Sequence, residues 1–270
     1  MSDQPLLSIH ELRKSFAISS GVLEGSTDGS RHRAMAVDGV TFSVARGETL
    51  GIVGESGCGK TTLARMILRL IEPDSGEMRF RGHDWSDAHG AELRALRSRI
   101  QMMFQDPVAS LNPRMKVGTI VGEPLAIHEP ILPRAERQSR TVQMLEAVGL
   151  TADSLARYPH EFSGGQRQRI GIARALILRP DLVVADEPVS ALDVSVGAQI
   201  LELLERLRRE FSLTLILISH SLPVVAQLAT RVAVMQGGRF VEIGPAEQVL
   251  QSAQDPYTQA LIAAVPEIPA

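Results

Sequence analysis

The segment GESGCGKT at residues 54–61 constrains the fold of this chain more than any other feature of the sequence. It follows a short apolar stretch at residues 49–53 and opens an amphipathic stretch that begins at Lys60. A glycine, four residues and then Gly-Lys-Thr is the P-loop pattern, in which a tight turn joins a strand to a helix. The order of these segments therefore predicts the beginning of a nucleotide-binding α/β unit.

The residues of this turn suit the binding of phosphate groups. Gly54, Gly57 and Gly59 lack side chains, so successive backbone N–H groups can turn inward toward phosphate oxygens. We expect Lys60 to reach the β- and γ-phosphates of ATP and the hydroxyl of Thr61 to bind Mg²⁺. The predicted nucleotide-binding set also contains Glu55, Ser56, Cys58 and Thr62. A chance glycine-rich turn is the alternative, and the strand and helix patterns on either side argue against it.

Two adjacent carboxylates end the apolar stretch at residues 182–186. Because neighbouring side chains on extended backbone point in different directions, Asp186 and Glu187 can perform different tasks. Asp186 is predicted to hold Mg²⁺ through water, and Glu187 to orient or deprotonate an attacking water. The alternative is a polar junction between a strand and a turn. The apolar run before the pair and the P-loop upstream favour catalysis.

The remaining segments indicate a sheet that is interrupted by helices. Residues 6–16 and 40–48 have strand patterns and flank a Gly/Ser-rich stretch of loop composition. From about residue 106 to 178 the pattern is helical. Residues 213–219 form a second apolar run typical of a strand buried on both faces, and residues 231–244 have the pattern of a hairpin. These features together predict a central, mostly parallel sheet.

Composition argues against several classes of protein. The 28 basic and 31 acidic residues are spread along the chain and only 4% of residues are aromatic, so no nucleic-acid partner is expected. A single cysteine, Cys58, excludes an internal disulfide and a multi-thiolate metal site and fits a reducing compartment. We expect no secretory signal, and no apolar run approaches the roughly 20 residues that span a bilayer. If the protein acts at a membrane, another chain must anchor it.

The segment FSGGQRQR at residues 162–169 resembles the signature of ATPases of the ABC family. Phe162 replaces the usual Leu, whereas the next residues match and precede a helical pattern: Ser163, Gly164, Gly165 and Gln166. The resemblance implies that two ATPase domains pair head to tail. The signature of one subunit then caps the γ-phosphate held by the P-loop of the other, as a helix start with small residues can do. Taken alone, such a Ser/Gly segment would indicate only a helix cap.

Three further positions match the ABC family. Gln105, in MMFQDP, resembles the Q-loop glutamine, which is implied to contact Mg²⁺ or the water. SALD at residues 190–193 resembles the D-loop, which places Asp193 at the dimer interface near nucleotide. His220 resembles the switch histidine that contacts the γ-phosphate and the attacking water. Ser221 replaces the Asp that follows this histidine in many relatives.

The resemblance covers nearly the whole chain and implies its fold class. We expect an α/β P-loop NTPase of ABC type: a RecA-like core with a mostly parallel sheet, an N-terminal antiparallel β subdomain and an inserted α-helical subdomain. Residues 1–105 and 179–245 would form the core with the β subdomain, 106–178 the helical subdomain and 246–270 a C-terminal extension, all within one ATPase domain. Phe16 is the candidate for the aromatic residue that stacks on adenine, with packing into the core as the alternative.

Several stretches resemble more narrowly the ATPase subunits of dipeptide and oligopeptide importers, above all RYPHEFSGGQ at residues 157–166 and DPYTQAL at residues 255–261. The likeness to the second, or F, subunit implies a peripheral protein on the cytoplasmic face of the inner membrane. Its implied partners are a second, homologous ATPase in a heterodimer, two transmembrane permease subunits and an extracytoplasmic solute-binding protein. Peptide is the expected cargo, with nickel, glutathione or another small solute as alternatives. No C-terminal cysteine cluster is present, so no iron–sulfur cluster is expected.

Two competing classes explain the sequence less well. A non-transport ABC ATPase would need long coiled-coil heptads or tandem ATPase domains, and neither appears in this sequence. A P-loop kinase or GTPase would leave FSGGQ and His220 unexplained.

Two further expectations concern single segments. Within the transporter interpretation, residues 106–114 are expected to dock on the permease, although an ordinary surface loop is the alternative. Where a reagent can reach it, Cys58 is expected to be more reactive than an ordinary cysteine, because a helix N-terminus and Lys60 favour its thiolate form; a small filler residue is the alternative.

Overall fold

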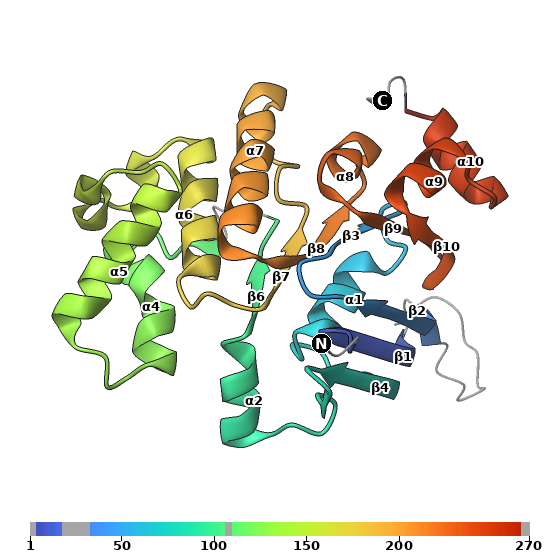
Figure 1. Cartoon of the computed structure of the whole chain (residues 1–270), viewed down its shortest axis with the longest axis horizontal. Coiled ribbons are helices and arrows are strands. Elements are labelled where there is room, and N and C mark those ends of the chain that lie inside the picture. Colours follow the sequence, from blue (N-terminus) through green and yellow to red (C-terminus); the bar gives the residue numbers. More distant parts are fainter. Residues whose placement is uncertain (1–3, 18–32, 106–109, 266–270) are drawn as a thin grey trace, which may run out of the picture.

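The computed structural model describes residues 4–17, 33–105 and 110–265. These residues form two β-sheets and a set of helices, and Figure 1 shows a helical group on one side of the central sheet and the second sheet on the other. The described structure thus has the expected α/β fold with a mostly parallel sheet and an N-terminal antiparallel sheet. The division of the chain at residues 105, 178 and 245 stays a prediction.

The larger sheet has six strands in the order β10-β9-β3-β8-β7-β6. Its parallel strands are β3 (Thr49–Val53), β6 (Ile100–Met103), β7 (Leu182–Asp186), β8 (Thr214–Ser219) and β9 (Arg231–Gln236). The edge strand β10 (Arg239–Pro245) runs antiparallel to β9. Every residue of β3, β7 and β8 is buried. Their continuous apolar runs therefore reflect a parallel sheet that is covered on both faces.

The smaller sheet is antiparallel and has the order β2-β1-β4-β5. Its strands are β1 (Leu7–Ala17), β2 (Arg33–Val44), β4 (Ser75–Phe80) and β5 (His83–Asp84). The strand predicted at residues 40–48 is confirmed over residues 40–44, but β2 begins earlier, at Arg33, and ends at Val44, before the turn at Arg46 and Gly47. Pairing with β1 extends from Val44 to Arg33 and lengthens the strand beyond its apolar pattern. The predicted Gly/Ser-rich loop lies almost wholly outside the described residues.

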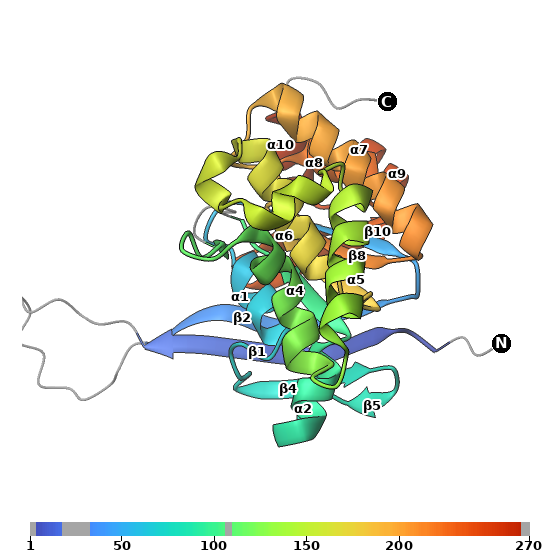
Figure 2. The same cartoon turned by 90° about the vertical axis from the view of Figure 1, so that its left-hand side faces the viewer.

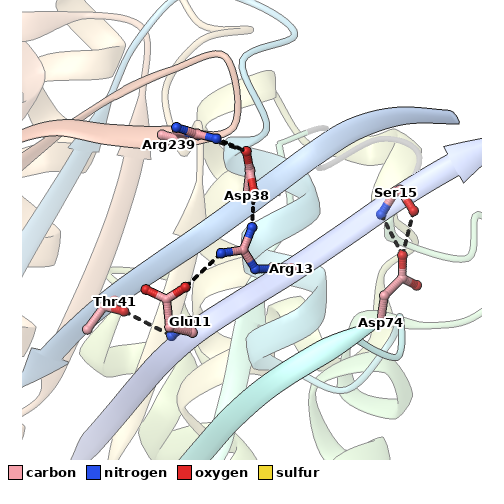
Figure 3. Close-up of polar contacts among 7 residues, drawn as sticks. All are labelled: Glu11, Arg13, Ser15, Asp38, Thr41, Asp74 and Arg239. Carbon is pink, nitrogen blue, oxygen red and sulfur yellow. Dashed lines mark hydrogen bonds and ion pairs between the residues drawn. The ribbon is translucent and has the colours of Figure 1, made fainter.

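One carboxylate ties the two sheets together. Asp38 on β2 lies between Arg13 on β1 and Arg239 on β10, as Figure 3 shows. The Arg239 Nε atom lies 2.8 Å from Asp38 Oδ2. In the same region Asp74 accepts hydrogen bonds from the hydroxyl and the N–H group of Ser15, at 2.6 and 2.8 Å. These bonds hold the pKa of Asp74 well below its usual range.

The helices cover the two sheets in separate groups. Helix α1 (Lys60–Ile67) shares an apolar cluster with both sheets, and α2 (Gly90–Arg97) precedes β6. The helical group beside the central sheet contains α4 (Val117–His128), α5 (Arg134–Ala147), η1 (Ala152–Ala156), η2 (Pro159–Glu161) and α6 (Gly164–Leu176). The remaining helices are α7 (Val194–Phe211), α8 (Leu222–Leu228), α9 (Ala246–Gln251) and α10 (Pro256–Ala263). Figure 2 views the molecule from the side of α4, α5 and α6.

The elements connect in the way that the sequence order predicts. Helix α7 links the parallel strands β7 and β8 as a crossover, and β9 and β10 form a hairpin that turns at Gly237 and Gly238. Both turn glycines have positive φ angles, 53° and 84°, which tight hairpin turns require. None of the helices within the described ranges is long and apolar enough to cross a bilayer.

Candidate active site

Two glycines of the P-loop are required by the close approach of other chain segments, whereas Gly57 has no such neighbour and is in the left-handed region with φ 82°. A Cβ atom on Gly54 would lie 2.1 Å from the carbonyl oxygen of Met235, and one on Gly59 would lie 2.1 Å from that of Ala36. The loop is therefore wedged between β2 and the β9–β10 hairpin. The Gly238 N–H group at the hairpin turn donates to the Cys58 carbonyl over 2.9 Å. The P-loop conformation is thus supported by segments far away in the sequence.

The ammonium group of Lys60 is held inside the loop. The Lys60 residue is only 6% exposed, and its Nζ atom donates to the carbonyl oxygens of Gly54 and Glu55 at 2.7 and 2.8 Å. It also lies 3.6 Å from the Cys58 sulfur, which is itself buried. A buried cation at a helix start concentrates positive charge beside the loop's N–H groups. The arrangement can bind the phosphate groups of a nucleotide.

Asp186 lies at the buried carboxyl end of β7, next to the P-loop helix. Its Oδ1 atom accepts a 3.5 Å hydrogen bond from the Thr61 hydroxyl. The two residues line a cavity of about 420 Å³ together with Gln105. Burial raises the pKa of Asp186 above its ordinary value, and the Thr61 hydrogen bond opposes that shift. Carboxylate, hydroxyl and amide oxygens at one cavity are the ligands that Mg²⁺ prefers.

Glu187 faces a different cavity from its neighbour Asp186. Its backbone is in the left-handed region with φ 49°, a conformation that costs a non-glycine residue about 1–3 kcal/mol. Its N–H group donates to the Ile218 carbonyl over 2.8 Å, and its Oε1 atom lies 2.8 Å from Nδ1 of His220. Glu187, Asp193 and His220 line a cavity of about 640 Å³. The carboxylate and imidazole can therefore bind and polarise one water molecule there.

The signature segment forms the exposed start of helix α6. The Ser163 hydroxyl accepts from the Gln166 N–H group at 3.3 Å, and the Gln166 side-chain oxygen accepts from the Ser163 N–H group at 3.0 Å. This reciprocal pair is a capping box. A Cβ atom on Gly165 would lie 2.5 Å from Cγ1 of Val196, so glycine lets the starts of α6 and α7 meet. The signature and the SALD segment are thus neighbours in one chain.

Asp193 has a structural contact of its own at the start of α7. Its carboxylate accepts hydrogen bonds from the Val196 N–H group at 3.0 Å and from the Ser195 hydroxyl at 2.8 Å. The bond from Val196 is the main cause that lowers the pKa of Asp193. The side chain therefore caps a helix, while lining the cavity that contains Glu187. A nucleotide contact for Asp193 stays a prediction.

Gln168 is a positioning residue that the sequence interpretation missed. Its amide is buried, and its Nε2 atom donates to the Pro188 carbonyl oxygen over 2.7 Å. Pro188 directly follows Glu187, so this bond ties the segment after the carboxylate pair to helix α6. The residue lies within FSGGQRQR, but helical spacing alone does not reveal which carbonyl its side chain meets.

The other predicted residues lie at the edges of this region. Phe16 near the end of β1 is 42% exposed, and the Lys14 Nζ atom lies 5.8 Å from its ring centroid. With this exposure the ring does not pack into the core, which was the alternative role, and its face is accessible for stacking on a base. Stacking itself stays a prediction.

The remaining predicted residues lie in the P-loop, in helix α1 and before α8. Ser56 is exposed in the P-loop and Thr62 is half-buried in α1. Ser221 precedes α8, and its N–H group donates to the Ser219 hydroxyl over 3.0 Å.

Comparison with known proteins gives a consistent result. The family model described as ABC transporter matches residues 37–190, more than half of the chain. The oligopeptide transport ATP-binding protein AppF of Bacillus subtilis is 48% identical over 98% of this chain and 79% of its own. The corresponding protein OppF of Salmonella typhimurium is 53% identical over 86% of this chain and 69% of its own. The dipeptide transport ATP-binding protein DppF of Haemophilus influenzae is 48% identical over 98% of this chain and 79% of its own.

Solved structures agree with these relatives. The ATP-binding cassette MJ0796, in a dimeric post-hydrolysis state with ADP and phosphate, matches with a TM-score of 0.76 and 26% identity. That match covers 89% of this chain and 98% of the solved one. CbiO1 of Clostridium perfringens, part of the ABC transporter complex CbiONQ, also matches with a TM-score of 0.76 and 26% identity, over 93% and 92% of the two chains. The chain therefore belongs to the ATP-binding proteins of the ABC transporter family.

Proposed function

We propose that this chain energises the uptake of di- or oligopeptides through a separate membrane permease. As an ABC ATPase it binds and hydrolyses ATP. The observation that supports the cargo class is the identity of about half of all aligned residues to proteins named for oligopeptide and dipeptide transport. The matches to two of them extend over 98% of the chain. Nickel, glutathione or another small solute is the alternative cargo.

The proposed chemistry follows from the positions of the site residues. The P-loop N–H groups and Lys60 would bind the phosphate groups of ATP. Thr61, Gln105 and Asp186 would hold Mg²⁺, which neutralises phosphate charge when bound. Glu187 would orient the attacking water and accept its proton, with His220 beside it to fix the position of that water.

We propose a partner set in which the exposed signature has a role. A second, homologous ATPase would place its P-loop against Ser163, Gly164, Gly165 and Gln166 of this chain. Two permease subunits and an extracytoplasmic solute-binding protein would complete the transporter, with this chain peripheral on the cytoplasmic face of the inner membrane. Residues 106–114 would dock on the permease, although 106–109 lie outside the described residues. The dimeric state of MJ0796 supports the pairing of two such cassettes.

The test begins with purification of the full-length chain from its native membranes. We expect it to copurify with a second ATPase and with apolar permease subunits, and cross-links from residues 110–114 to reach a permease. Ligand binding to the associated solute-binding protein then distinguishes peptides from nickel or glutathione. Copurification with ribosomes or DNA in place of membrane proteins would refute the transport proposal. Cross-links to soluble proteins alone, in a verified complex, would refute the docking of this segment.

A further inference from the structure

The DPYTQAL segment forms a firmly anchored helix start at the edge of the central sheet. Asp255 caps α10, because its carboxylate accepts from the N–H groups of Tyr257 and Thr258 at 2.8 and 3.2 Å. The preceding backbone is bound in turn to β10: Glu242 accepts from the N–H groups of Gln254 and Asp255 at 2.9 and 3.2 Å. Two carboxylates therefore fix where α10 begins and where its first side chains point.

The side chain of Tyr257 reaches from this helix to the P-loop. The N–H group of Glu55 donates to the Tyr257 hydroxyl oxygen over 3.2 Å, across 202 positions of sequence. The tyrosine ring packs against the main apolar cluster, and burial raises the pKa of its hydroxyl. The hydroxyl is therefore neutral at physiological pH and is held by a packed ring. Such a group can serve as a fixed hydrogen-bond acceptor.

The contact has a consequence for Lys60, because two bonds meet at one peptide unit. The N–H group that Tyr257 binds and the carbonyl oxygen of Gly54 belong to the same planar Gly54–Glu55 peptide. That carbonyl oxygen accepts the 2.7 Å hydrogen bond from the Lys60 ammonium. Tyr257 on one side and Lys60 on the other thus fix the rotation of this plane. Since Gly54 is in the left-handed region with φ 154°, its flexible backbone would otherwise permit other orientations.

We propose that Tyr257 is a positioning residue for nucleotide binding: its hydroxyl orients the Gly54–Glu55 peptide that holds the Lys60 ammonium at the P-loop. The inference rests on the ATP-binding function of the chain and extends it to the C-terminal region. Through Glu242, Asp255 and Tyr257, the edge strand and α10 support the phosphate-binding turn. The β9–β10 hairpin supports the same loop from another direction, at Cys58.

The test compares the two tyrosines of the chain in the purified full-length subunit. Tyr257→Phe removes one hydroxyl and keeps the packed ring, whereas Tyr158→Phe makes the same change beside His160, on which Tyr158 stacks. We expect Tyr257→Phe to weaken ATP and ADP binding by about threefold to tenfold, the range for one hydrogen bond. Tyr158→Phe should leave both affinities unchanged. Thermal unfolding of each variant measures stability separately.

A second readout uses the single thiol. Loosening of the loop should increase the rate at which a maleimide labels Cys58 in Tyr257→Phe, relative to the parent and to Tyr158→Phe. Saturating ATP should still protect the thiol in all three proteins. This measurement reports the local mobility of the P-loop, which a merely structural loss of stability at α10 would leave unchanged.

The outcomes separate the inference from the function on which it rests. If Tyr257→Phe lowers only the unfolding temperature and binds nucleotide like the parent, the tyrosine is structural and the inference is wrong. If the parent itself does not bind ATP, the ATP-binding function is refuted instead. Should Tyr257→Phe fail to fold, Asp255→Ala frees the start of α10 while keeping the hydroxyl. Unchanged nucleotide affinity in that variant would likewise overturn the inference.

Discussion

The P-loop and the signature segment are both glycine-rich helix starts, yet the structure supports them differently. Glu55, Ser56 and Gly57 of the P-loop are exposed, but the loop also contacts β2, the β9–β10 hairpin and Tyr257, and its Lys60 is only 6% exposed. Ser163, Gly164 and Gln166 are exposed, and the contacts of this turn are with its own helix and with α7. The difference fits the proposal that the P-loop is the phosphate cradle of this chain and that the exposed signature turn meets the nucleotide of a second ATPase.

The largest effect is expected from Glu187, the residue proposed to orient the attacking water. Glu187→Gln keeps the shape of the side chain and loses the base, so ATP should still bind while turnover falls by about a hundredfold or more. The measurement is the ATP hydrolysis rate of the assembled transporter, with Glu202→Gln on the exposed face of α7 as the matched control. Equal hydrolysis rates for Glu187→Gln and the parent would remove Glu187 from the mechanism.

The P-loop charge should have the next largest effect. Lys60→Ala removes the buried ammonium, and we expect nucleotide affinity of the isolated subunit to fall by about tenfold to hundredfold, the range for charge-assisted hydrogen bonds. Lys116→Ala, at an exposed lysine before α4, should bind ATP like the parent. If Lys60→Ala retains both nucleotide affinity and ATP hydrolysis, the P-loop is not the phosphate cradle.

A charge in the signature segment tests the proposed contact of this segment with a second ATPase. Gly164→Asp places a carboxylate where the nucleotide of a second ATPase is expected, and like charges repel. Hydrolysis by the assembled transporter should fall by about tenfold, while ATP affinity of the isolated subunit stays unchanged.

The matched control is Gly164→Ala, because a Cβ atom there meets its nearest neighbour, Cδ2 of Leu192, at an ordinary 3.5 Å. This variant adds the same carbon without the charge and should hydrolyse ATP at nearly the parent rate. A loss of ATP affinity in isolated Gly164→Asp would show that the signature segment acts on the nucleotide of its own chain and not on that of a second ATPase.

The smallest effect is expected on the stability of the folded protein, through Asp186 and Asp193. Burial raises the pKa of Asp186, so the stability linked to its protonated form is present below the unfolded-state pKa and lost as pH rises through the folded one. Asp186→Asn should therefore raise the unfolding temperature at neutral pH, by about 2–4 °C per kcal/mol gained.

Asp193 provides the opposite case. Its lowered pKa means that its stabilising contribution is present above the unfolded-state pKa and lost as pH falls through the folded one. Asp193→Asn should accordingly lower the unfolding temperature at neutral pH. In unfolding temperatures measured from pH 7 downward, Asp186→Asn should approach the parent as the pH falls toward the ordinary Asp pKa of about 4, whereas Asp193→Asn should approach the parent only below about pH 4. A shift of the same sign in both variants would contradict these assignments.

The local elements that carry the chemistry can be predicted from the residues of each segment. Residues 182–186 and 213–219 were predicted as buried strands, and the structure has them as Leu182–Asp186 and Thr214–Ser219. The pattern of a glycine, four residues and Gly-Lys-Thr, together with the strand and helix patterns beside it, predicts the P-loop that the structure has between β3 and α1. Local patterns suffice here because buried parallel strands and glycine turns depend on the residues of the segment itself.

Which distant groups meet depends on how the elements pack in the folded chain. Pairing with β1 determines where β2 begins, and the apolar pattern of β2 did not reveal that position. The sequence likewise contained Gln168 and Tyr257 without indicating that one binds Pro188 and the other Glu55. The physical reason is that a side-chain hydrogen bond depends on position to within a fraction of an ångström. That position is set by how helices and sheets pack together, to which residues far apart along the chain contribute.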